Sequence, residues 1–210
     1  MLSPIVSFIR NRWHPLWRLR HSSAFRDFQG KFDLTVCTRI PETDIKVSVK
    51  LLRDASWILA PSSLEAEVRS AFTLVLDLLN PAVFWDVGAN IGFYSWFVRR
   101  HPSVQKVLMF EPDPVNFALL ESTIRNNELA DCEAKNLALS DSVGEASFLL
   151  DRASGAGGSL MSVSRFDRNR KIRSAYSLNE TVTCRTATAD GPIAAGMLPP
   201  SLMKIDVEGT

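Results

Sequence analysis

Hydrophobic and polar residues follow two different patterns along this chain, which change near residue 61. From residue 32 to residue 60, apolar and polar residues alternate in places, as in "FDLTVCTRI" and "IKVSVKLLRD". This alternation predicts short strands of a small N-terminal β-element. Before them, residues 1–28 carry apolar side chains at roughly helical spacing with arginines between them, which predicts a helix that is interrupted or restarted at Pro15.

The segment "SSLEAEVRSAFTLVLDLLN" has the period of a helix. Ser62 or Ser63 can cap its first turn, and the Asn80–Pro81 pair is expected to end it. The predicted apolar face consists of Leu64, Val68, Phe72, Val75 and Leu79.

From residue 82 onward, short apolar runs alternate with helical segments. Strands are predicted for "AVFWDVG", "VQKVLMFEPD", "CEAKNLALSD", "GEASFLLD", "TVTCRTATAD" and "LMKIDVEG". Helices are predicted for "IGFYSWFVRRH" and for "PVNFALLESTIRNNEL", which begins with a proline suited to a first helical turn. Strands alternating with helices predict an α/β fold built on a doubly wound, mostly parallel sheet. We therefore expect an N-terminal extension over residues 1–60 and one α/β domain over residues 61–210.

Composition narrows the class of protein. The chain has 210 residues, of which 46% are hydrophobic, and a net charge of +1. It can therefore bury a sizeable core, and its charge indicates no general attraction to nucleic acid. Its three cysteines and three histidines share no spacing typical of a metal site, and the scattered cysteines favour a reducing, cytoplasmic location.

Acidic residues follow the predicted strands. Because ligands bind at the carboxyl ends of parallel strands, these acids predict a site along one edge of the sheet. They are Asp86, Glu111 with Asp113, Asp141, Asp190, and Asp206 with Glu208.

The first of these corners reads Asp86-x-Gly88-x-x-x-Gly92, which differs from the GxGxxG of nicotinamide enzymes. Its glycines allow a tight turn close to a ligand. Glu111 follows 25 residues after Asp86, close to the interval at which an acid meets a ribose hydroxyl pair. A ligand with both an amino acid end and a nucleoside end fits, and S-adenosylmethionine is one. Alternatively, Asp86 is only a turn or capping residue and Glu111 a solvated strand end.

In order and spacing, "FWDVGANIGFYSWF", "MFEPDPVNFALLESTIRNN", "NLALSDSVGEASFLL" and "LMKIDVEG" resemble the signature blocks of FkbM-type S-adenosylmethionine-dependent methyltransferases. The resemblance covers about residues 65–209. It implies a class I methyltransferase fold that is Rossmann-like, and methylation of a hydroxyl on a small molecule or glycan.

The resemblance also implies positions for the cofactor. Its methionine end is expected near Asp86, Gly88, Ala89, Asn90 and Gly92. The residues expected around its ribose and adenine are Glu111, Pro112, Asp113, Ser140 and Asp141. Asp206 and Glu208 are expected beside the transferred methyl group, either as a base or as positioning residues.

The sequence leaves alternatives for the extent of the chain, its function and its two basic segments. In the family that the chain resembles, further elements follow the "KIDVEG" block, so the chain is expected to be a C-terminally truncated fragment. The alternatives are a non-catalytic cofactor-binding module and, less well supported, a nicotinamide-dependent oxidoreductase. The basic segment 1–28 either packs on the domain or contacts a membrane surface. The Arg-rich stretch 152–174 is either a surface loop or a contact for an acidic substrate.

Overall fold

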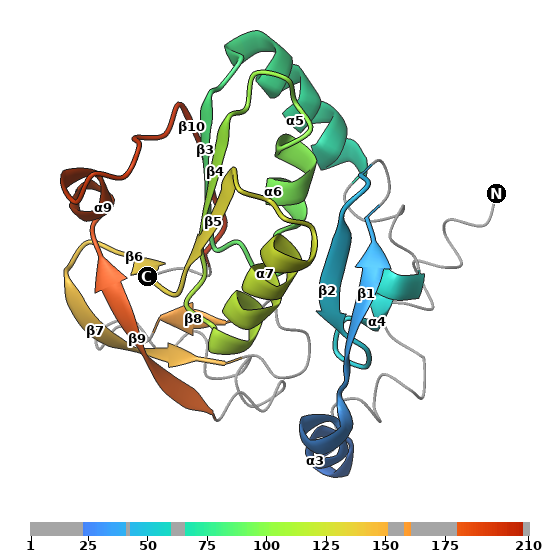
Figure 1. Ribbon diagram of the computed structural model, residues 1–210. Helices are drawn as coiled ribbons and strands as arrows, with labels where there is room; N and C mark the ends of the chain where they lie inside the picture. Colours follow the sequence, from blue (N-terminus) through green and yellow to red (C-terminus); the bar gives the residue numbers. More distant parts are fainter. Residues whose placement is uncertain (1–22, 41–42, 60–65, 151–157, 161–179, 208–210) are drawn as a thin grey trace.

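The computed structural model describes residues 23–40, 43–59, 66–150, 158–160 and 180–207 (Figure 1). Residues 1–22, and with them most of the predicted basic helix, lie outside these ranges, as does most of the Arg-rich stretch 152–174. The described chain begins with helix α3 (Ser23–Phe32).

A four-stranded parallel sheet forms the centre of the molecule (Figure 1). Its strands, in spatial order, are β10 (Leu202–Ile205), β3 (Val83–Val87), β4 (Lys106–Phe110) and β5 (Cys132–Lys135). The two central strands are nearly continuous apolar runs because both of their faces are buried. Phe84 and Met109 join the core on one face, whereas Trp85 and Phe110 join the core on the other. The predicted α/β class with a parallel sheet is confirmed.

Three helices cover one face of this sheet: α5 (Ala66–Leu79), α6 (Phe93–Val98) and α7 (Pro114–Asn126) (Figure 1). Helix α7 begins at the predicted proline, and the side chain of Asp113 caps it by accepting a hydrogen bond from the Val115 N–H at 2.7 Å. Helix α5 ends before Asn80, as predicted.

The apolar face predicted for α5 is wrong in its rotation. Val68, Val75 and Leu79 are exposed, whereas Leu76 is buried. Phe72 is the described member of the predicted face that packs inward, and its ring contacts the rings of Phe84 and Tyr94. This aromatic contact sets the rotation of the helix, and periodicity could not choose between two adjacent apolar stripes.

A second, mixed sheet lies on the other face (Figure 1). Its order is β6 (Ala138–Leu139), β9 (Thr181–Ala187), β7 (Gly144–Leu149) and β8 (Ser159–Leu160), and the short helix α9 (Asp190–Ala194) follows β9. The single strand predicted for the run 132–141 divides into β5 and β6, which belong to different sheets. Asn136 lies at the break, where its Nδ2 donates to the carbonyl oxygens of Glu111 and Pro112 at 2.9 and 3.1 Å.

The predicted N-terminal strands form an antiparallel hairpin, β1 (Thr35–Arg39) and β2 (Lys46–Lys50). Helix α4 (Ala55–Leu59) follows, within a stretch for which the sequence predicts extended structure. Val47 and Val49 are fully buried in the same core as Phe84. This core therefore crosses the predicted boundary at residue 60, and the boundary itself stays a prediction.

The hairpin is also attached to α7 by buried hydrogen bonds. The hydroxyl of Thr123 accepts from the Ser48 N–H at 2.9 Å and donates to the Leu119 carbonyl oxygen at 2.9 Å. Thr123 is completely buried. Its hydroxyl therefore satisfies a buried backbone donor of β2 with a partner outside the hairpin.

Replacing Thr123 by valine is expected to lower the free energy of unfolding by about 1–3 kcal/mol, because the Ser48 N–H is left buried without its acceptor. Urea-induced unfolding followed by circular dichroism measures the change. Thr73→Val is the matched control, since the Thr73 hydroxyl also bonds a helix carbonyl, at 3.0 Å from the oxygen of Arg69, but its side chain is exposed. An equal loss in both variants would contradict this account.

The helices of the described ranges are short. The longest, α5, has 14 residues, whereas a membrane span needs roughly 20. Within those ranges, none of the helices combines the length and the hydrophobicity that crossing a bilayer demands.

Candidate functional site

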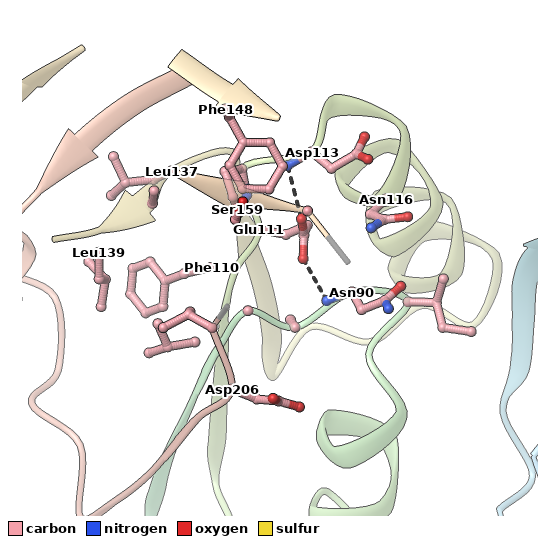
Figure 2. A pocket seen from close by; sticks show the side chains of 18 of the residues that line it. Asn90, Phe110, Glu111, Asp113, Asn116, Leu137, Leu139, Phe148, Ser159 and Asp206 are labelled. Carbon is pink, nitrogen blue, oxygen red and sulfur yellow. Dashed lines mark hydrogen bonds between the residues drawn. The ribbon is translucent and has the colours of Figure 1, made fainter. Parts of the chain in front are cut away.

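A cavity of about 220 Å³ opens at the carboxyl ends of β3, β4 and β10. Strand β3 connects through α6 to β4 on one side, and β10 returns to its other side, so the strand order reverses beside β3. This reversal is where ligands bind in open α/β sheets. Side chains from both sheets line the cavity (Figure 2), and a side chain of α4 lines it as well.

Gly88 forms the turn that follows β3 and lines the cavity. Its φ of +74° lies in the left-handed region, and a Cβ added there would lie 2.2 Å from the backbone oxygen of Asp206. The N–H groups of Gly88 and Ala89 both donate to the Phe110 carbonyl oxygen, at 3.0 and 3.2 Å. Gly88 is therefore required because the chain at the end of β10 approaches this turn closely. The approach of a ligand is not the only reason for a glycine here.

Gly92 has a different reason to be glycine. It does not line the cavity, and its φ is +85°. An added Cβ would lie 2.6 Å from the indole of Trp96, which is fully buried and donates to the Ile91 carbonyl oxygen at 2.8 Å. The second glycine of the motif therefore leaves room for the Trp96 indole, which packs against the backbone at the start of α6.

Glu111 projects into the cavity from the end of β4 (Figure 2). The Asn90 N–H donates to its Oε2 at 2.6 Å, and the Asp113 N–H donates to its Oε1 at 2.9 Å. Each carboxylate oxygen is thus anchored by one backbone donor and keeps capacity to accept another hydrogen bond. The carboxylate joins the turn after β3 to the cap of α7.

The buried position of Glu111 disfavours the negatively charged form of its carboxyl group. Burial raises the pKa of Glu111 to about 7. The two backbone hydrogen bonds counteract the rise, and the nearby charges of Asp113 and Asp86 add to it. Glu111 therefore changes its protonation state near neutral pH, at the floor of the cavity.

Asp86, which is expected near the methionine end of the cofactor, does not line the cavity. It is completely buried, and its Oδ2 accepts a hydrogen bond from the Ser95 hydroxyl at 2.7 Å. Its Oδ1 lies 3.1 Å from the Lys204 Nζ, an ion-pair contact whose geometry falls short of a hydrogen bond. Burial raises the pKa of Asp86, and Lys204 and Ser95 counteract that shift. Asp86 thus contacts Lys204, which lines the cavity, and does not line the cavity itself.

Sequence reasoning missed Lys204, which lines the cavity from β10. Its Nζ lies 3.4 Å from the Asp206 carboxylate, donates to the Gly88 carbonyl oxygen at 3.2 Å and lies 5.1 Å from the centre of the Tyr94 ring. Asp206 also lines the cavity, with a side chain that is 74% exposed. A lysine within an apolar strand, two residues before an acid, was the available signal.

The structure brings seven of the twelve predicted site residues to the wall of the cavity. Ser140 and Asp141 lie outside it, because the chain turns into the second sheet at β6, and the Ser140 hydroxyl bonds the Asp141 carboxylate at 3.2 Å. Glu208 lies outside the described residues. Those at the cavity are Gly88, Ala89, Asn90, Glu111, Pro112, Asp113 and Asp206.

The second sheet and its connections supply an apolar wall that the sequence did not predict. Leu137, Leu139 and Phe148 form this wall on the side of the cavity beyond Glu111, where Ser159 of β8 and Phe110 of β4 also line the cavity (Figure 2). No local pattern in the sequence places β7 and β8 over the end of β4, since that proximity depends on the division of run 132–141 between two sheets.

An aromatic group also reaches the cavity from the N-terminal part of the chain. Trp57 of α4 lines it and packs on Phe93, with ring centres 4.9 Å apart, and Phe93 contacts Tyr94 at 5.3 Å. The predicted N-terminal extension therefore contributes directly to the site.

Comparisons with known proteins agree with this arrangement. A family model described as "Methyltransferase FkbM domain" matches residues 86–210, more than half of the chain. Among curated proteins, "Methyltransferase sdnD" from Sordaria araneosa is 38% identical over 66 residues, which cover 31% of this chain and 25% of that protein. The matched region thus spans about a quarter of the length of this relative.

The solved structures that match the chain share little sequence with it and have low TM-scores. A methyltransferase from Geobacter sulfurreducens is 23% identical, with a TM-score of 0.30, over 34% of this chain and 39% of that one. TYW2 from M. jannaschii, in complex with AdoMet, is 15% identical, with a TM-score of 0.36, over 53% of each chain. At such TM-scores these structures carry no argument about the site.

Proposed function

The chain belongs to the FkbM methyltransferase family, and from this premise we propose that its cavity binds S-adenosylmethionine for methylation of a hydroxyl group on a small molecule or glycan. The observation that carries the proposal is the buried carboxylate of Glu111, which two backbone amides hold beside the Gly88 turn. When bound, S-adenosylmethionine supplies an electrophilic methyl group on a sulfonium.

The residues present fit this cofactor. Each oxygen of Glu111 keeps room for one further hydrogen bond, so the pair can accept both hydroxyl hydrogens of an unphosphorylated ribose. The apolar wall of Leu137, Leu139 and Phe148 suits the flat face of a nucleobase. The turn from Gly88 to Asn90 is proposed to hold the amino acid end.

Asp206 is proposed to accept the proton that a hydroxyl acceptor loses as it becomes a nucleophile. Its carboxylate lines the cavity, is mostly exposed and is held by Lys204 at 3.4 Å. A positioned base contributes about 10²–10⁴-fold to a rate. The predicted contribution of Glu208, whose position is not described, remains part of the same proposal.

Calorimetric titration of the full chain with S-adenosylmethionine and, separately, with NADH tests the proposed cofactor. Heat of binding is expected with S-adenosylmethionine and none with NADH. Binding of NADH alone would support the oxidoreductase alternative, and the absence of binding by either compound would contradict a cofactor site in this cavity.

The titration of Glu111 predicts opposite pH dependences for affinity and stability. Because the ribose hydroxyls donate to the carboxylate form, affinity for S-adenosylmethionine is expected to be about tenfold lower at pH 6 than at pH 8, around a pKa of about 7. The folded pKa lies above the ordinary value of 4.5, so the stabilising contribution of Glu111 is complete below pH 4.5 and is lost as pH rises through 7.

The Glu111→Gln variant, which cannot titrate at this position, is the control for both effects. Calorimetry and urea unfolding at pH 5, 6, 7 and 8 measure them. Relative to this variant, the native chain is expected to lose stability between pH 5 and pH 8. If both proteins show the same pH profiles, Glu111 does not titrate in this range.

The proposal also covers the acceptor molecule, the cellular location and contact with a membrane. The acceptor is proposed to be a small molecule or glycan, with no nucleic acid partner. A cytoplasmic location is proposed because Cys37, Cys132 and Cys184 are all unpaired. The suggested weak contact of residues 1–28 with a membrane surface falls mostly on residues that the structure does not describe.

A further inference from the structure

The charges at the cavity are unequal in sign. Among the described residues that line it, the charged side chains are those of Glu111, Asp113, Asp206 and Lys204. In this described part of the wall, Lys204 is therefore the single cation. A fourth carboxylate, that of Asp86, lies beside Lys204 on the neighbouring strand β3.

The side chain of Lys204 is fixed in place by several contacts of its ammonium group. Lys204 sits opposite Asp86 in the register of β10 against β3. Its ammonium contacts the carboxylates of Asp86 and Asp206 and the carbonyl oxygen of Gly88, at 3.1, 3.4 and 3.2 Å, and its side chain is 13% exposed. These contacts fix both the position of the charge and the approach of the Asp206 carboxylate to the Gly88 turn.

We propose that Lys204 is a positioning residue that sets the electrostatic potential of the cavity, and with it the preference for S-adenosylmethionine over S-adenosylhomocysteine. This inference rests on the proposed function. The two compounds differ at sulfur by a methyl group and one positive charge, so the ratio of their affinities reports the potential at that atom. Without the ammonium, three cavity carboxylates would favour the cationic compound far more strongly.

A fixed positive charge in the cavity affects the exchange of product for cofactor during turnover. The enzyme has to exchange a neutral product for a cationic cofactor in the same cavity. Lys204 limits the electrostatic attraction for the cation while it holds Asp206 in place. A residue that served only the packing of β10 would not change the ratio of the two affinities.

The test compares three variants in which no buried charge is left without its partner. D86N is the reference, since the amide of an asparagine side chain can keep a hydrogen bond with Ser95. D86N/K204R keeps the positive charge on β10, and D86N/K204M removes it. Isothermal titration with S-adenosylmethionine and with S-adenosylhomocysteine gives the ratio of affinities for each variant.

Removal of the charge in D86N/K204M is expected to increase the preference for S-adenosylmethionine about tenfold relative to D86N. D86N/K204R is expected to stay within about twofold of D86N. K106M is the control for loss of a lysine elsewhere, because Lys106 pairs with Glu133 at 3.6 Å at the opposite end of β4, and it is expected to leave the ratio of the native chain unchanged.

A further variant keeps the inference testable if the Asp86 variants do not fold. Asp206→Asn alters an exposed side chain and removes a negative charge, so it is expected to lower the preference for S-adenosylmethionine several-fold in the otherwise native chain.

The outcomes separate this inference from the proposed function. If the native chain binds both compounds but the methionine and arginine variants show the same ratio, Lys204 does not set the potential, and the proposed function stands. If Asp206→Asn leaves the ratio unchanged, the inference is likewise overturned. If the native chain binds neither compound, the proposed function fails and this inference fails with it.

Discussion

Gly88→Val is expected to abolish detectable binding of S-adenosylmethionine and to destabilise the fold. The added Cβ would lie 2.2 Å from the Asp206 backbone oxygen and 3.3 Å from the Val207 side chain. Backbone atoms of a neighbouring strand cannot move aside as a flexible side chain can. The φ of +74° adds strain, since a β-branched residue rarely adopts it.

The structure changes the reason for this expected loss. From the sequence, Gly88 is expected to allow a tight turn close to a ligand, so that valine would fill space that the ligand needs. In the structure the first carbon of any side chain already collides with the end of β10. Gly88→Ala is therefore expected to lose most of what Gly88→Val loses, as measured by calorimetric titration and by thermal unfolding.

Gly30→Ala is the matched control for Gly88→Ala. Gly30 lies within helix α3, and no atom lies within 4 Å of the Cβ that alanine would add. This variant is expected to keep full affinity and to gain about 0.5–1 kcal/mol of stability, because alanine favours a helix over glycine. Native affinity and stability in Gly88→Ala would refute the described approach of β10.

Glu111→Ala is expected to weaken binding of S-adenosylmethionine at pH 8 by about 1.5–3 kcal/mol, which corresponds to roughly 10–150-fold in Kd. The truncation removes both acceptors for the ribose hydroxyls. It also releases the Asn90 N–H and the Asp113 N–H, which the carboxylate holds at 2.6 and 2.9 Å. Calorimetric titration measures the loss.

Asp141→Ala is the control, because this acid was also expected at the cofactor but lies exposed and outside the cavity wall. Its affinity is expected to equal that of the native chain. If Asp141→Ala loses as much affinity as Glu111→Ala, the cofactor contacts residues outside the cavity wall, and its proposed placement within this cavity is wrong.

Local patterns in the sequence were sufficient for the central strands and their turns. Runs such as that of β4 are short and apolar at nearly every position, which favours a strand buried on both faces. Pro114 placed the start of α7 because the preference of proline for a first helical turn is a local effect. The Gly88 turn and Glu111 were found for the same reason: each follows directly from a strand end.

Other features depended on contacts between distant segments, which no local pattern reports. Lys204 meets Asp86 because β10 pairs with β3, and those residues lie 118 positions apart. Trp57, Leu137 and Phe148 reach the cavity from three separate elements. The sequence by itself thus determined the strands of the central sheet and the acids that follow them, because backbone preference and burial act over a few residues. The tertiary structure alone decided which of those acids face the cavity and which one is buried against a lysine, because strand order and packing set the neighbours of each charge.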